Sequence, residues 1–241
     1  IGDYIMSLSV AEYKQKLYRE DITLFIPSYL EELHRYISHM PAISYNRNSV
    51  ENMKAFYRNV KDKSFEKLYL LPFSFSTAWI GFKTGIKKRR GVSKEMRGLL
   101  LTERVSAKIQ SRDKHLTKEY CEILQVNKVE PQELPCSLKV DNGPENYIVI
   151  CPGAKYGPAK KWDGYGDFIS RVDKPVYIVG GAAEKEDAEM LRNEYPEKVT
   201  NFTGNKTLKE SAEIISKASA VVSNDSGLMH VASSVNTPTV A

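Results

Sequence analysis

The chain has 241 residues and a formal net charge of +5, with 41% hydrophobic and 27% charged residues. This composition is ordinary for a soluble protein, and the length suffices for one large or two modest domains. No apolar stretch approaches the length of a membrane span, and the sequence shows no signal peptide, which argues against a membrane-spanning protein.

Cysteine and histidine usage gives no sign of a disulfide framework or a metal site. The cysteines are an odd number without C-x-x-C spacing: Cys121, Cys136 and Cys151. The histidines show no metal-ligand pattern. We therefore expect no metal, no cofactor and a reducing, cytoplasmic compartment. Cys151 ends an apolar run, so we expect it in the core.

The N-terminal half alternates apolar runs with charged segments. Residues 22–26 and 68–72 are typical of buried strands, and the charged residues 53–67 predict a helix between them. This alternation favours an α/β domain. We expect the aromatic side chains that follow to build core and cleft wall: Tyr69, Phe73, Phe75 and Trp79.

Much of the basic excess lies in residues 83–97, whose centre is Lys87, Lys88, Arg89 and Arg90. The run is either a solvated edge of the domain or a surface for an acidic partner. Nucleic acid is a weaker third alternative, because aromatic interleaving is sparse and no nucleic-acid-binding motif follows. We expect no nucleic-acid partner.

Residues 128–146 contain three prolines and Asn142-Gly143 without sustained periodicity, which predicts a linker. We therefore expect an N-terminal domain over residues 1–135 and a C-terminal domain over residues 136–241.

The C-terminal half has a regular alternation of predicted strands and helices. Strands are expected at residues 147–151, 175–179, 199–202 and 220–222, and helices at 165–172, 184–195, 208–217 and from 227 to Pro238. Such alternation predicts a parallel, doubly wound sheet, which binds ligands at the carboxyl ends of its strands. The loop at 152–162 would bring Lys155, Lys160 and Lys161 to that edge.

The turn before the last helix places Asp225, Ser226 and Gly227 at a helix N-terminus, where free N–H groups and the helix dipole favour an anion. His230 lies four residues after Ser226 and shares its helix face. The alternative is an ordinary N-cap and a packed histidine. Neither a G-x-x-x-x-G-K-[ST] nor a G-x-G-x-x-G motif is present, which disfavours a P-loop ATPase or a dinucleotide dehydrogenase.

Three motifs resemble glycosyltransferase family 9, the ADP-heptose:lipopolysaccharide heptosyltransferases, and its heptosyltransferase II branch in particular. Residues 152–162 read P-G-A-K-Y-G-P-A-K-K-W, residues 224–232 read N-D-S-G-L-M-H-V-A, and residues 1–7 contain the Gly2-Asp3 turn. Residues 71–78 and 85–97 are a weaker fourth match.

The resemblance implies two Rossmann-like, doubly wound domains that face a cleft, the GT-B fold. The N-terminal domain would bind the acceptor and the C-terminal domain the nucleotide-sugar. The implied reaction is an inverting, metal-independent transfer of L-glycero-D-manno-heptose from ADP-heptose to the lipopolysaccharide inner core. The protein would be cytoplasmic and could act at the inner face of the inner membrane. Family members extend further at both ends, so we expect the fold to be incomplete at both termini.

The resemblance also implies residue roles. Asp3 would be the general base that accepts the proton of the acceptor hydroxyl; its alternative is the N-cap of a helix through Ser9 and Tyr13. The expected donor-binding residues are Lys160, Glu184, Asp225, Ser226, Gly227 and His230, with Lys160 on phosphate and Glu184 on ribose. The expected acceptor-binding residues are Lys87, Lys88, Arg89, Arg90 and Arg97.

Two alternatives stay open. The chain could be a family 9 transferase with a different sugar or acceptor, which donor binding alone would not distinguish. It could also be a non-catalytic nucleotide-sugar-binding module, which would have no use for Asp3.

Overall fold

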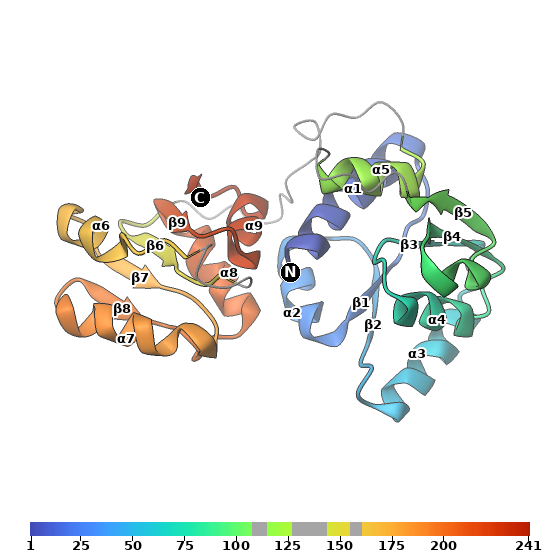
Figure 1. Ribbon diagram of the computed structural model, residues 1–241, viewed down its shortest axis with the longest axis horizontal. Helices are drawn as coiled ribbons and strands as arrows, with labels where there is room; N and C mark the ends of the chain where they lie inside the picture. The colour runs from blue at the N-terminus through green and yellow to red at the C-terminus, as the bar shows by residue number, and fades with distance from the viewer. Residues whose placement is uncertain (108–114, 127–143, 155–160) are drawn as a thin grey trace. The chain divides into compact units, whose positions relative to one another are not determined.

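The computed structural model describes residues 1–107, 115–126, 144–154 and 161–241 (Figure 1). The chain divides into two compact units. The N-terminal unit contains Met6–Glu31 and Met40–Pro135, and the C-terminal unit contains Ile1–Ile5, Glu32–His39 and Cys136–Ala241. The predicted linker lies largely outside the described residues. The sequence did not indicate that two short N-terminal segments would group with the C-terminal half.

In chain order, the elements up to residue 126 are α1 (Gly2–Tyr18), β1 (Leu24–Pro27), the 3-10 helix η1 (Ser28–Leu30), α2 (Glu31–Ile37), β2 (Ala42–Tyr45), α3 (Val50–Asp62), β3 (Lys67–Leu70), α4 (Phe75–Lys83), β4 (Lys88–Ser93), the 3-10 helix η2 (Glu95–Leu100), β5 (Glu103–Ser106) and α5 (Leu116–Leu124). β1 pairs with β2, and β3, β4 and β5 form a three-stranded sheet in that order. Every pair is parallel. The strand predicted at 22–26 is confirmed as β1, which begins two residues later and ends one residue later.

The predicted helix at 53–67 has wrong bounds. α3 begins at Val50 because the Ser49 side chain caps it, accepting from the N–H of Asn52. It ends at Asp62, and Ser64 adopts a left-handed φ of 51° that a helix cannot continue through. Lys67 already belongs to β3.

The aromatic prediction is half right. Tyr69 and Phe73 pack against the core cluster around Val92, Val105 and Ile123. Phe75 and Trp79, in contrast, are 47% and 45% exposed on α4, so they do not build the core. That they form cleft wall stays a prediction.

The C-terminal unit contains one five-stranded parallel sheet in the order β10-β9-β6-β7-β8 (Figure 1). Its elements after residue 144 are β6 (Ile148–Cys151), α6 (Tyr165–Arg171), β7 (Val176–Ile178), the 3-10 helix η6 (Ala182–Glu184), α7 (Lys185–Glu194), β8 (Val199–Asn201), α8 (Leu208–Ser216), β9 (Ala220–Ser223), α9 (Gly227–Ser234) and β10 (Thr239–Val240). The strands and helices predicted for this half are confirmed. Their central residues are fully buried, among them Val149, Ile150 and Val221, and Cys151 is in the core as expected.

No helix among the described residues is both long enough and apolar enough to cross a bilayer.

Candidate functional site

The strand order of the C-terminal sheet contains a topological switch point. From β6 the chain proceeds outward to β7 and β8, then returns to place β9 on the other side of β6. The loops after β6 and β9 therefore leave the sheet side by side in opposite directions. In open parallel sheets this is where a crevice forms and ligands bind. Both long motifs of the sequence, at 152–162 and 224–232, begin at these two loops.

Asn224 joins the two loops. Its side chain is buried: Nδ2 donates to the carbonyl of Pro152 at 2.7 Å, and Oδ1 accepts from the N–H of Trp162 at 3.1 Å. One amide thus fixes both the entry and the exit of the lysine-containing loop against the start of α9. The sequence analysis gave Asn224 no role, although its place in the N-D-S-G motif was a usable signal.

The N-terminus of α9 begins with Ser226 in extended conformation at the N-cap position. The Ser226 hydroxyl does not cap the helix and lies 3.3 Å from the Ser223 hydroxyl. The alternative of an ordinary serine N-cap is therefore wrong. Without that cap, the first N–H groups of α9 and its dipole can bind an anionic group. Asp225 is exposed beside them.

The first residues of the chain pack on α9 within the C-terminal unit. A Cβ built on Gly2 would lie 2.6 Å from His230 Cδ2, and one built on Gly227 would lie 2.9 Å from Ile1 Cβ. Only glycines allow this approach. The backbone beside Asp3 therefore lies against the imidazole of His230.

Asp3 itself is exposed and lies in the first turn of α1, which starts at Gly2. The alternative of an N-cap aspartate is thus replaced by a first-turn carboxylate. Such a carboxylate still interacts favourably with the helix dipole, and its oxygens can face solvent or a substrate.

Glu184 lies at the carboxyl ends of β6 and β7. Its Oε2 accepts from the N–H of Gly181 at 2.7 Å. A Cβ on Gly153 would lie 3.1 Å from Oε1 of the same carboxylate. Glu184 is thus held beside the first residues of the loop after β6, on the same sheet edge as α9.

Of the three loop lysines, only Lys161 is described. It forms an ion pair with Asp187 in the first turn of α7. Lys155 and Lys160 lie outside the described residues. The role assigned to Lys160 therefore stays a prediction.

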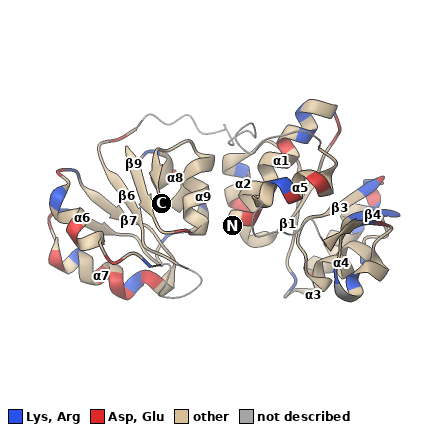
Figure 2. Ribbon diagram, turned by 45° about the horizontal axis from the view of Figure 1, so that its top comes forward, with Lys and Arg blue, Asp and Glu red and all other residues tan. Residues whose placement is uncertain are grey.

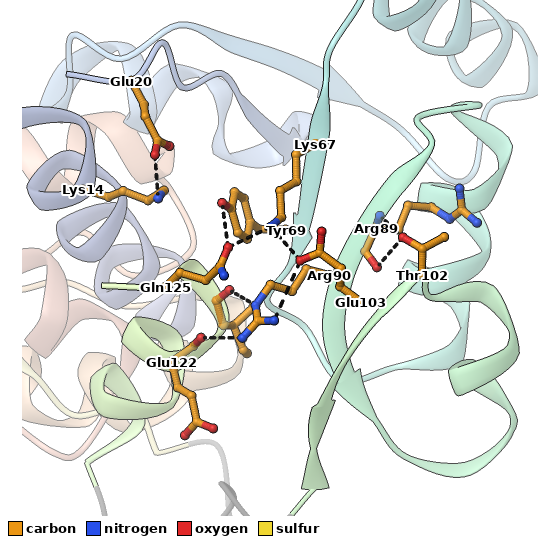
Figure 3. A network of polar contacts seen from close by, with 11 residues as sticks. Lys14, Glu20, Lys67, Tyr69, Arg89, Arg90, Thr102, Glu103, Glu122 and Gln125 are labelled. Atoms are coloured by element: carbon orange, nitrogen blue, oxygen red, sulfur yellow. Dashed lines mark hydrogen bonds and ion pairs between the residues drawn. The ribbon is translucent and has the colours of Figure 1, made fainter. Parts of the chain in front are cut away.

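The central basic run of the N-terminal unit is part of a sheet from Lys88 onward, because β4 is the middle strand between β3 and β5 (Figure 1). Arg90 donates from Nε to the carbonyl of Ile123 at 3.0 Å and lies 3.8 Å from Glu103 (Figure 3). Arg89 donates to the carbonyls of Leu100 and Ile86. These half-buried arginines stabilise the sheet, whereas Lys87 and Lys88 are exposed.

Arg97 is the most unusual of the predicted acceptor residues. It is 1% exposed, and Nη1 donates to the carbonyl of Pro72 at 2.8 Å. Nε and Nη2 are buried and have no hydrogen-bond partner in the described part of the chain. Burial lowers the pKa of the guanidinium. A buried cation with two unpaired donors is energetically costly, so Arg97 is an unusual feature of this unit.

Within the residues that the structure describes, no three His, Cys, Asp or Glu side chains group so that they could hold an ion.

A family profile, related sequences and solved structures all match this chain to the same family of proteins. Residues 53–241 match the profile of glycosyltransferase family 9 (heptosyltransferase). Lipopolysaccharide heptosyltransferase 2 of Escherichia coli K12 is 28% identical over 278 residues, which cover 100% of this chain and 79% of that protein.

Solved structures show the same relationship. The structure of E. coli ADP-heptose lipopolysaccharide heptosyltransferase II has a TM-score of 0.83 at 25% identity, covering 100% of this chain and 81% of that one. E. coli heptosyltransferase WaaC with ADP has a TM-score of 0.75 at 15% identity, covering 99% and 82%, and shares the fold. The expected fold class, two α/β units of the GT-B type, is confirmed.

Proposed function

The chain belongs to glycosyltransferase family 9, and from this premise we propose that it transfers L-glycero-D-manno-heptose from ADP-heptose to the inner core of lipopolysaccharide. The observation that carries the proposal is the meeting of the Gly2-Asp3 turn with His230 at the start of α9. Under this proposal, Asp3 as base and the N-terminus of α9 as diphosphate site would lie at the same edge of the five-stranded sheet.

The donor would bind at the switch point. Its diphosphate would lie at the N-terminus of α9, where Ser226 and Gly227 present N–H groups, with Lys160 offsetting further charge. Glu184, held by the Gly181 N–H, is available to the ribose hydroxyls. Asp225 and His230 would contact the sugar and diphosphate near the anomeric carbon. Since these groups neutralise the leaving diphosphate, the transfer needs no divalent cation.

Asp3 would act as general base. The acceptor hydroxyl gives its proton to the Asp3 carboxylate while its oxygen bonds to the anomeric carbon. The bond from that carbon to the diphosphate breaks, and ADP leaves with the electron pair. Because attack occurs opposite the leaving group, the anomeric configuration inverts. The transition state has oxocarbenium character, as in other glycosyl transfers.

The acceptor would bind to the N-terminal unit. Lipopolysaccharide core acceptors carry acidic groups, and Arg97 would contribute positive charge there from its buried position. Lys87 and Lys88 are exposed and add positive charge. Arg89 and Arg90 contribute through the sheet that they stabilise. The acceptor is anchored to lipid, so we place the reaction at the cytoplasmic face of the inner membrane.

The test is incubation of the protein with ADP-heptose and a panel of core acceptors, read by mass spectrometry. The proposal predicts addition of one heptose to an inner-core acceptor, with release of ADP. Transfer of another sugar or to another acceptor would establish the alternative family 9 activity. ADP-heptose binding without transfer to any acceptor would establish the non-catalytic module instead.

A further inference from the structure

We propose that the outer face of α4 together with η2 is a lipid-docking surface, which inserts apolar side chains into an anionic membrane. The inference extends the proposed function, because it concerns how the protein reaches an acceptor anchored in lipid.

In α4 the small side chains face the sheet and the large aromatic side chains face solvent, the reverse of the usual arrangement. Its buried residues are small: Thr77, Ala78 and Gly81. A Cβ on Gly81 would lie 2.9 Å from Leu70 Cδ2 of β3, so the helix is pressed closely onto the sheet. Phe75, Trp79 and Phe82 follow at spacings of four and three residues, which places them on one helix face. All three are exposed.

The exposed aromatic face of α4 continues onto η2. Phe75 lines an apolar groove of about 430 Å³ together with Met96, Leu99 and Leu100. Met96 and Leu99 are 67% and 72% exposed. Single exposed apolar residues are common on protein surfaces, whereas a contiguous apolar patch of this kind marks an interaction site.

Positive charge surrounds the apolar surface. Lys83 Nζ lies 5.1 Å from the centre of the Trp79 ring, and the Arg89 guanidinium lies 5.3 Å from that of Phe82. Lys87, Lys88 and Lys94 are exposed nearby in sequence, and Figure 2 shows basic colour on β4. Residues 67–94 contain no Asp or Glu.

The sequence of this surface contains one acidic residue, Glu95 of η2, against the basic residues Lys83, Lys87, Lys88, Arg89 and Lys94. An aromatic face with such a predominantly basic rim matches an anionic lipid surface. The rings fit the boundary of headgroups and acyl chains, while lysines contact lipid phosphates. A second copy of the chain fits less well, because a two-fold contact through this face would bring two basic rims together.

The direct test is sedimentation of the purified protein with vesicles. Vesicles of phosphatidylglycerol and phosphatidylethanolamine are compared with vesicles of phosphatidylcholine alone. We expect binding to the anionic vesicles, weakened by salt and strongly reduced for phosphatidylcholine. The double variant W79S/F82S should lose at least tenfold in affinity, and Lys83→Glu several-fold. Met190→Ser and Lys54→Glu, exposed residues elsewhere, should bind as wild type does.

Tryptophan fluorescence locates the contact. Brominated lipid should quench emission in the wild type and in Trp162→Phe, but not in Trp79→Phe. No binding to anionic vesicles, or equal binding by W79S/F82S, would overturn the proposal. A dimer that W79S/F82S dissociates, without any vesicle binding, would overturn it in favour of a second copy.

An activity assay separates this inference from the proposed function. W79S/F82S should transfer heptose normally to a soluble core acceptor stripped of its acyl chains, and poorly to the same core embedded in vesicles. Equal activity on both would contradict the docking surface while leaving the proposed transfer intact. Inactivity of the wild type on both acceptors would contradict the proposed transfer and leave the vesicle-binding result to stand alone.

Discussion

Asn224 shows how much a single buried amide can determine. It satisfies the Pro152 carbonyl and the Trp162 N–H, two backbone groups ten residues apart that frame the lysine loop. Nothing in composition or periodicity distinguishes such an asparagine from a turn residue. Its role depends on which two strands become neighbours.

The change Asn224→Ala should weaken donor binding, because it frees both ends of the loop from α9. It also leaves the buried Pro152 carbonyl without its partner, which costs about 1–3 kcal/mol. We expect at least a tenfold rise in the ADP dissociation constant by calorimetry. Asn193→Ala, on the exposed side of α7, is the control. Unchanged ADP affinity in Asn224→Ala would refute the role.

A change at Arg97 should affect the acceptor and leave the donor unaffected. Arg97→Met removes the two unpaired buried donors, and a charge-assisted hydrogen bond is worth roughly 1.5–3 kcal/mol. We therefore expect the acceptor KM to rise about tenfold or more while the ADP-heptose KM stays constant. Stability should be kept or improved, since an uncompensated buried charge is removed. Steady-state kinetics decide this, with Arg58→Met as control, and an unaltered acceptor KM would count against it.

At the scale of elements, the C-terminal half follows its sequence closely. Apolar runs such as 147–151 are as long as a typical strand and are bounded by turn residues, so they can be identified in the sequence. β4 escaped prediction because its sequence, K-R-R-G-V-S, resembles a solvated segment. Its arginines are satisfied by carbonyls of Ile123 and Leu100, which are distant in sequence and invisible to a local pattern.

The candidate site could be predicted only in part. The N-D-S-G-L-M-H motif located the start of α9, but the strand order that sets β9 beside β6 is a property of the whole sheet. Likewise, nothing in the sequence alone placed Gly2 against His230. The exposure of the aromatic face of α4 was also missed, because apolar residues at helical spacing normally predict a buried face.

Gly85 and Gly204 should each be sensitive to substitution. Their φ angles are 77° and 69°, which residues other than glycine rarely adopt. Gly85→Ala should cost about 1 kcal/mol from backbone strain alone, since its Cβ would meet nothing within 4 Å. Gly204→Ala should cost more, because its Cβ would lie 3.2 Å from the backbone of Ala182.

Urea titration measures both glycine changes. Gly166→Ala, within α6 and in ordinary contact with Leu191 and Tyr195, is the matched control and should be neutral or stabilising. Equal free energies of unfolding for Gly85→Ala and Gly204→Ala would show that the close approach at Gly204 is relieved at no cost.

The molecule as a whole should lose stability in alkali. Burial raises the pKa of Cys151 from 9.0 to about 12, and raises the pKa of Tyr147 from 10.0 to about 12. Between pH 9 and 12 both groups keep their protons in the folded protein, whereas the unfolded chain releases them. Their contribution to the free energy of unfolding is therefore complete below pH 9 and is lost as pH rises toward 12.

The urea midpoint at pH 8, 9.5 and 10.5 tests this loss. We expect the midpoint to fall with pH, and the fall to be shallower in Cys151→Ala, whatever its stability at pH 8. Parallel curves for the two proteins would mean that the Cys151 thiol does not contribute to alkaline unfolding.

The central claim is that a glycosyltransferase of family 9 uses Asp3 as its base beside a donor bound at α9. The most direct measurement is single-turnover transfer by Asp3→Asn, combined with calorimetry of ADP-heptose binding and with Asp173→Asn, an exposed site, as control. The account predicts that Asp3→Asn transfers heptose about 10²–10⁴-fold more slowly, while its donor affinity and fold are those of the wild type. Transfer at the wild-type rate by Asp3→Asn would contradict it.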